Sequence, residues 1–314
     1  MKIGIAGSTD VRATVERCRH LGVEAVFLPC AFLPGYREQG YPDLDALRAI
    51  KRALEAEGIA VPSACTWFAK WPVQESDWRS GRSTDPAIVL RKDRRCMDAM
   101  VRTIEVLGES EIVSVLHYVD IGKPDGDVEA CWEALIEMYR ELIPAAEQYG
   151  VGIGNHSLHR LLPDDLRENA VAKGVRLDDY GVYTTEGWGG PFLVDTPDAL
   201  GRLVDAVPSP CNGVTMCTGM DIVGGEVKDL VEKFAGKIHF CQLRDHTDRW
   251  PGGVEVLSGE GRVDLRGVIE ALGETDYTGI LHPEHLGKSA DEDEDRLAKA
   301  VDYVRGVMDE LDSE

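Results

Sequence analysis

Four short apolar segments of this chain end in side chains that can bind a metal ion. Cys217 ends one of them and is followed by Thr-Gly, while His156, Gln242 and Glu284 end three others. One imidazole, one thiol, one carboxylate and one amide form a ligand set for a single divalent cation and leave positions open for substrate and water. The sequence therefore predicts a mononuclear metal site in an enzyme.

Each of these side chains also has a structural interpretation. His156 could be a polar cap at a strand end, Cys217 a small core side chain and Glu284 a salt-bridged residue at the rim. Gln242 is the weakest ligand, because an amide oxygen competes poorly with water. Sulfur and nitrogen favour Zn²⁺, whereas carboxylate and amide oxygens favour Mn²⁺ or Mg²⁺, and Fe²⁺ is compatible with both groups. The ligand types alone do not determine which metal ion binds.

Elements that can position these groups alternate along the whole chain. The apolar periodicity predicts eight strands, Lys2–Ala6, Ala25–Leu28, Ala60–Ala64, Ile112–Leu116, Gly152–Asn155, Gly213–Cys217, Ile238–Leu243 and Gly279–His282. It predicts eight helices, over 10–21, 43–57, 88–107, 128–149, 197–206, 226–234, 265–272 and 292–311. Strict alternation implies parallel strands with right-handed crossovers. We therefore expect a single (β/α)8 TIM-barrel domain over residues 1–314.

Residues at the predicted helix ends support this assignment. Glycines follow four helices, and three polar residues precede others as N-caps; these residues are Gly22, Gly58, Gly108 and Gly150, and Asp43, Thr196 and Asp264. An open doubly wound sheet is the alternative, but Gly7-Ser-Thr-Asp10 stands where a glycine-rich phosphate loop would follow the first strand. The tail, residues 309–314, is expected to fray.

The predicted strand-to-helix loops are long, whereas most helix-to-strand loops are short. In a TIM barrel this places the long loops at the C-terminal face, where active sites lie. The longest, 156–195, should form a lid or wall. Tryptophans in these loops would make an aromatic pocket rim or serve as packing anchors; they are Trp67, Trp71, Trp78, Trp188 and Trp250.

Strand alternation brings the predicted ligands to one rim, because every second residue faces the barrel interior. By the same rule His239 should face the outer helices as a structural histidine. Around the rim, Arg244 and Lys288 are candidates for holding a carboxylate, and His285 for moving a proton near neutral pH. Further candidates for contact with the substrate are Tyr118, His159, Trp188, His246, His282, Asp245 and His117.

Charge and cysteine usage narrow the function class. The formal net charge of −22 argues against a nucleic-acid backbone or an anionic membrane as partner. Eight scattered cysteines without a CxxC pair, after a Met1-Lys-Ile-Gly-Ile start that resembles no signal peptide, predict reduced thiols in the cytoplasm. No apolar run approaches the length of a membrane helix, which is about 18 residues or more.

Several of these segments are similar to those of the mannonate dehydratase family, within the wider xylose-isomerase-like barrels. Thr215-Met-Cys-Thr-Gly219 matches the family's cysteine segment almost letter for letter, Ile238–Arg244 resembles its strand ending in His-Leu-Arg, and Pro283-Glu-His285 resembles its Pro-Asp-His segment. The resemblance implies a manganese-type site of His156, Cys217, Gln242 and Glu284, with His285 as acid/base beside Arg244. It also implies dehydration of a sugar acid to a 2-keto-3-deoxy acid, and a homo-oligomer.

The chain departs from this family at four places. Gln242 replaces a histidine, Glu284 replaces an aspartate, and His156-Ser-Leu-His159 replaces His-Pro-Asp-Asp. The family's catalytic tyrosine has no counterpart in residues 286–295, and Tyr303 is expected in the core. Two alternatives therefore stay open: a sugar isomerase or epimerase of the xylose-isomerase-like group, and a degenerate barrel that binds a sugar acid without turning it over.

Overall fold

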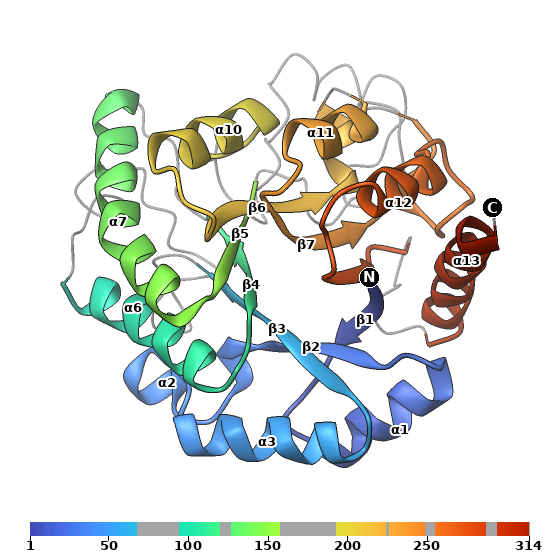
Figure 1. Ribbon diagram of the computed structural model, residues 1–314, viewed down its shortest axis with the longest axis horizontal. Coiled ribbons are helices and arrows are strands. Elements are labelled where there is room, and N and C mark those ends of the chain that lie inside the picture. Colours follow the sequence, from blue (N-terminus) through green and yellow to red (C-terminus); the bar gives the residue numbers. More distant parts are fainter. Residues whose placement is uncertain are drawn as a thin grey trace, which may run out of the picture.

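Eight parallel strands close into a barrel with helices on its outer side (Figure 1). The structure is a computed structural model that describes residues 1–67, 94–119, 127–157, 193–223, 226–248, 255–286 and 294–313. The barrel strands are β1 (Lys2–Ala6), β2 (Ala25–Pro29), β3 (Ala60–Trp67), β4 (Ser114–Tyr118), β5 (Gly152–His156), β6 (Asn212–Cys217), β7 (Ile238–Leu243) and β10 (Ile280–Pro283). Each strand pairs with its sequence neighbours, and β10 pairs with β1 to close the ring. The predicted (β/α)8 barrel is confirmed.

The helices follow the predicted periodicity closely. They are α1 (Val11–Leu21), α2 (Tyr36–Gln39), α3 (Leu44–Ala56), α6 (Arg94–Glu109), α7 (Val128–Tyr149), α10 (Pro197–Ala206), α11 (Val227–Lys233), α12 (Leu265–Gly273) and α13 (Glu294–Ser313), with 3₁₀ turns η1 (Cys30–Phe32) and η3 (Thr218–Val223). The side chains of Asp43, Thr196 and Asp264 accept hydrogen bonds from backbone amides three residues on, as N-caps do. Gly22 and Gly150 end their helices in the left-handed conformation.

Three local predictions were wrong. Gly108 is not a cap, because α6 continues to Glu109; a Cβ at Gly108 would lie 2.5 Å from Cβ of Tyr149, so close helix packing requires this glycine. The fourth strand starts at Ser114 rather than Ile112, a shift of two residues that leaves the side-chain alternation unchanged. Residues 309–313 do not fray but continue α13 to Ser313.

His239 also differs from its prediction. The pairing of β6 with β7 shifts between Val214 and Thr215, so that Ile238 packs in the large core under the helices while Phe240 packs inside the barrel. The imidazole of His239 consequently lies over two glycines: a Cβ at Gly152 would be 2.4 Å from its Nδ1. Gly152 shares the inner face of β5 with His156, so His239 packs toward the barrel interior and not toward the outer helices.

A two-stranded antiparallel ribbon lies beyond the end of β7. It pairs β8 (Asp245–His246) with β9 (Glu255–Val256), between the predicted strand ending at Leu243 and the predicted helix starting at residue 265, where no strand was predicted. Residues 158–192, most of the predicted lid, lie outside the described residues. The ribbon begins directly after Arg244, at the C-terminal end of β7.

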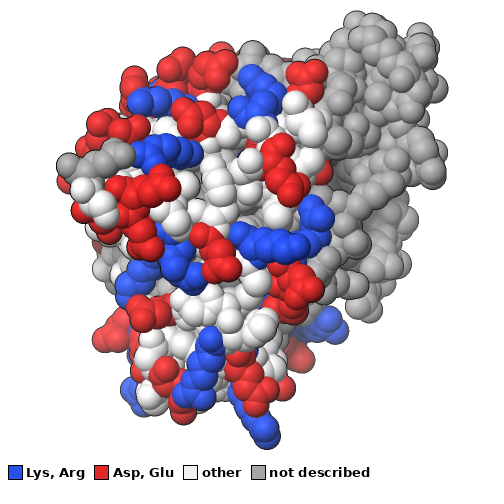
Figure 2. All heavy atoms as spheres, turned by 90° about the vertical axis from the view of Figure 1, so that its right-hand side faces the viewer, with Lys and Arg blue, Asp and Glu red and all other residues white. Residues whose placement is uncertain are grey.

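The described residues carry surface charges of both signs and free thiols. Acidic and basic side chains are interspersed on the face that carries α13 (Figure 2). Among the described helices, none combines the length and apolar character that crossing a bilayer requires. Free thiols are found at Cys18, Cys30, Cys65, Cys131, Cys211, Cys217 and Cys241.

Candidate metal centre

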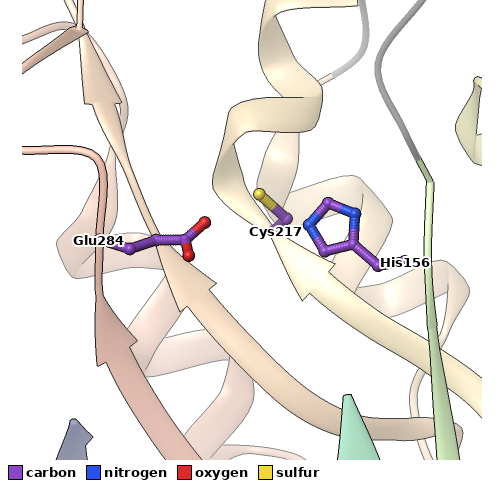
Figure 3. Close-up of side chains that lie close together, drawn as sticks. All are labelled: His156, Cys217 and Glu284. Atoms are coloured by element: carbon purple, nitrogen blue, oxygen red, sulfur yellow. The ribbon is translucent and has the colours of Figure 1, made fainter. Parts of the chain in front are cut away.

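Three of the four predicted ligands converge at the C-terminal end of the barrel. His156 is the last residue of β5, Cys217 the last of β6, and Glu284 follows β10. One potential ligand atom of each lies within 4.8 Å of those of the other two. Figure 3 shows the imidazole, the sulfur and the carboxylate close together at the ends of three different strands. The convergence follows from alternation, since each side chain is on the inner face of its strand.

His156 presents one ring nitrogen to this cluster in a defined tautomer. Its Nδ1 lies 2.5 Å from the carbonyl oxygen of Ser157, so Nδ1–H donates and Nε2 carries the lone pair. The side chain is 2% exposed. Burial, followed by the charge of Arg244, lowers its pKa to about 4, so the ring is neutral at pH 7. A neutral imidazole whose second nitrogen donates to a carbonyl is the usual form of a metal-bound histidine.

Cys217 is fully buried, and its strand end is fixed to the next strand. Burial raises the pKa of its thiol to about 12, although Arg244 opposes the shift. The hydroxyl of Thr218 donates to the carbonyl oxygen of Arg244 at 2.7 Å and accepts from its backbone amide at 2.6 Å. The thiol is therefore protonated in the ion-free protein, and the hydrogen bonds of Thr218 connect the end of β6 to Arg244 after β7.

Glu284 has both carboxylate oxygens engaged by the neighbouring strand. Nε of Arg244 donates to Oε1 at 2.6 Å, and Nε2 of Gln242 donates to Oε2 at 2.6 Å. Burial alone would raise the pKa of Glu284, but the charge of Arg244, with smaller contributions from three histidines, lowers it to about 2. Nε of Arg244 therefore binds Glu284, and contact of Arg244 with a substrate carboxylate stays a prediction.

Gln242 completes the cluster and links it to Tyr118. Its Nε2 also donates to the hydroxyl of Tyr118 at 3.2 Å, while its Oε1 is buried and makes no hydrogen bond within the described part of the chain. The ring of Tyr118 lies 4.8 Å from that of His156, between centroids. Tyr118, predicted as a substrate contact, therefore lies beside the predicted ligands.

His285 is paired with a residue that the sequence analysis missed. Its Nδ1 lies 3.0 Å from Oε1 of Glu255, a residue of β9. Glu255 also approaches Arg244, with 3.7 Å between Oε1 and a terminal guanidinium nitrogen. A two-residue strand shows no periodicity, so the sequence carried no signal for Glu255 beyond its acidic side chain and its place in a long C-terminal loop.

The remaining candidates divide into three groups. His282 lies below the cluster, where its Nδ1 donates to the carbonyl of Gly4 at 3.0 Å and its Nε2 is 3.9 Å from Glu284. His246, Asp245 and His117 are buried, and substrate contact by any of them stays a prediction. Lys288, His159 and Trp188 lie outside the described residues.

Comparisons with known proteins agree with this architecture. A mannonate dehydratase of Saccharophagus degradans is 29% identical over 236 residues, which is 65% of this chain and 52% of the relative, so the chain spans about half the length of that protein. The crystal structure of a mannonate dehydratase from Streptococcus suis serotype2 superposes with a TM-score of 0.70 at 16% identity, covering 99% of this chain and 93% of that one. An IolI protein with a bound zinc atom superposes with a TM-score of 0.63 at 15% identity, covering 99% and 98%. Residues 15–307 match the family described as xylose isomerase-like TIM barrel, and the chain belongs to that family.

Proposed function

We propose that this chain is a metal-dependent lyase that dehydrates a sugar acid to a 2-keto-3-deoxy acid. The observation that carries the proposal is the convergence of His156, Cys217 and Glu284 within 4.8 Å at the C-terminal end of the barrel. Active sites of this fold lie at that end. The relatives named mannonate dehydratase supply the reaction type, although the chain covers about half of the relative's length.

The residues present fit a divalent cation. His156 has the tautomer of a metal ligand, Gln242 has a buried Oε1 without a hydrogen bond in the described part of the chain, and Cys217 and Glu284 complete an N, S, O donor set. We propose these four side chains as the ligands and Mn²⁺ as the ion. A bound divalent cation supplies Lewis-acid stabilisation of negative charge on substrate oxygens.

Proton transfer is assigned to His285. Dehydration of an aldonic acid removes the proton on the carbon beside the carboxylate and releases the hydroxyl of the next carbon as water. His285 follows a proposed ligand directly, and its Nδ1–H donates to Glu255, so Nε2 has the lone pair that takes the proton. Protonation of the departing hydroxyl requires an acid. Tyr118 supplies a phenol at the cluster, where burial raises its pKa well above the ordinary value and keeps it protonated.

Substrate contacts are proposed at Lys288, His246, His159 and Trp188, as the sequence predicts. A cytoplasmic location and a homo-oligomeric state also remain predictions of the sequence. Light scattering on the purified protein measures the oligomeric state.

A sugar isomerase or epimerase is the second candidate. The observation in its favour is the environment of Arg244, whose Nε donates to Glu284 and whose terminal nitrogen lies 3.7 Å from Glu255. The carboxylates of Glu284 and Glu255 offset the positive charge of this guanidinium, and a neutral sugar requires no free positive charge for its binding. A degenerate sugar-acid-binding barrel is the third, and the missing family tyrosine and Gln242 favour it.

Metal analysis and product analysis distinguish the lyase, the isomerase or epimerase, and the degenerate barrel. Protein purified without added ions should contain about one divalent ion per chain, and the Cys217→Ala variant much less. The loaded protein is then incubated with a panel of aldonic acids and free sugars. A 2-keto-3-deoxy product supports the lyase, interconversion of the sugars supports the isomerase, and absence of both products with ligand binding supports the degenerate barrel.

A further inference from the structure

Glu255 contacts two groups beside the metal centre without belonging to the ligand cluster. Its carboxylate oxygens lie 3.0 and 3.1 Å from Nδ1 of His285, and Oε1 lies 3.7 Å from Arg244. The side chains of Glu255 and His285 are 19% and 21% exposed, which leaves them at the edge of the solvent-accessible site. Glu255 is thus placed to act on the proton-transferring histidine and on the arginine at once.

The backbone that carries Glu255 is fixed by one buried carboxylate. Asp245 is 1% exposed, and its two oxygens accept from four backbone amides, those of His246, Gly259, Gly261 and Val263, at 2.9 to 3.1 Å. A Cβ at Gly261 would lie 2.1 Å from Oδ1 of Asp245, so only glycine permits this arrangement. The ribbon pairs His246 with Glu255, and Asp245 therefore fixes the position of β9 relative to the end of β7.

His285 is itself held in an unusual backbone conformation. Its φ of 51° lies in the left-handed region, which non-glycine residues adopt only where their surroundings stabilise them. The Nδ1 contact to Glu255 is such a stabilising interaction. A carboxylate that accepts from Nδ1–H also fixes which ring nitrogen carries the lone pair.

We propose that Glu255 is a positioning residue: it orients His285, fixes its Nε2 lone-pair tautomer, and shares Arg244 with Glu284. The catalytic consequence rests on the proposed function, whereas the effect on the imidazole does not. This division lets one set of variants test the two separately.

The first test measures the imidazole directly. Histidine labelled with ¹⁵N is incorporated, and the ring nitrogens of His285 are assigned with the His285→Gln variant, at about pH 9, where an ordinary histidine with a pKa of about 6.5 is neutral. We expect a protonated Nδ1 in the parent protein and a mixture of tautomers in Glu255→Ala. Glu255→Gln, whose amide oxygen can still accept, should restore the parent tautomer, and Glu255→Leu, which cannot accept, replaces the alanine variant if that variant does not fold. An unchanged His285 spectrum in Glu255→Ala overturns the proposal.

The second test measures turnover of the substrate identified in the panel. Glu255→Ala should lower kcat by about 10- to 100-fold with a smaller change in KM. Glu255→Gln should recover part of the lost kcat. Glu260→Gln, at an exposed position of the same segment, is the matched control and should leave turnover unchanged. Equal kcat values for Glu255→Ala and the parent contradict the positioning role. If the panel yields no product, the proposed function fails, and the tautomer measurement still decides the role of Glu255.

Discussion

Nε of Arg244 lies 2.6 Å from Oε1 of Glu284, and the two side chains are only 5% and 10% exposed. The residues come from neighbouring strand ends, so the ion pair joins β7 to β10 at the C-terminal face. In a buried pair each charge depends on the other, because removal of one leaves an uncompensated charge in a low-dielectric environment.

Arg244→Ala should therefore reduce the free energy of unfolding by about 3–5 kcal/mol in the ion-free protein. Urea denaturation measures the change. Arg12→Ala, which breaks an ion pair whose side chains are 88% and 62% exposed, is the control and should have little effect. Arg244→Ala combined with Glu284→Gln should recover much of the loss, since both charges are then absent. An equal loss in the double variant would show that packing, and not the charge pair, is responsible.

Binding of a divalent cation at the cluster should release about one proton, because the pKa of Cys217 is raised to about 12 without an ion and the thiolate is the ligand. Calorimetric titration with Mn²⁺ or Zn²⁺ in buffers of different ionisation enthalpy counts the protons. Cys217→Ser should bind at least about tenfold more weakly. Cys211→Ser is the matched control, because Cys211 is a half-buried thiol that precedes β6, at the opposite end of that strand from Cys217. Binding without proton release would mean that the sulfur is not a ligand.

Ion-free protein should lose stability as the pH falls below about 6.5. Burial lowers the pKa of His117 to about 3 and, together with Arg244, that of His156 to about 4. The unfolded chain therefore binds protons that the folded chain excludes, so the stabilisation is complete above pH 6.5 and is lost as pH falls toward the folded pKa values. Each histidine contributes a slope of about 1.4 kcal/mol per pH unit inside its window.

Urea midpoints measured between about pH 7.5 and pH 4.5 check this slope. His117→Gln carries no titrating group at this position. It should reduce the slope of the unfolding free energy against pH by about 1.4 kcal/mol per pH unit, the contribution of one histidine. A slope that stays the same in this variant would refute the burial of a neutral His117.

Gly213→Ala should destabilise the barrel, because a Cβ there would lie 2.0 Å from the carbonyl oxygen of Lys237 in the connection to β7. Overpacking against backbone costs about 1–3 kcal/mol or more. Gly306→Ala, in α13 with nothing within 4 Å of the added Cβ, is the opposite case and should stabilise by about 1 kcal/mol. Thermal unfolding of the two variants measures the contrast; equal midpoints would contradict the close approach of β6 and β7.

The sequence predicted the barrel and most of the cluster because both depend on short-range patterns. Alternation along β5 and β6 and the residues following β10 placed His156, Cys217 and Glu284 on the inner face, and strand order then brought them to one rim. The prediction failed for His239, since a bulge between neighbouring strands reverses side-chain direction and leaves no mark in a single sequence.

The role of Arg244 and the presence of Glu255 were not predictable in the same way. The partner of a guanidinium is set by distances between strands, here 2.6 Å to Glu284, and not by spacing along the chain. The ribbon that carries Glu255 is held by Asp245, which accepts from four backbone amides between His246 and Val263, the last of them 18 positions along the chain. These hydrogen bonds connect a side chain to backbone amides, which every residue type except proline carries. The amino-acid composition of the segment therefore does not reveal them.

The pairing of β10 with β1 closes the barrel, and Glu284 follows that last strand. A nascent chain still lacking its final segment can already hold the imidazole and the thiol, but it has no acidic partner for them. The proposed ligand set is therefore complete only when the last strand of the barrel has paired with the first, which couples ion binding to barrel closure.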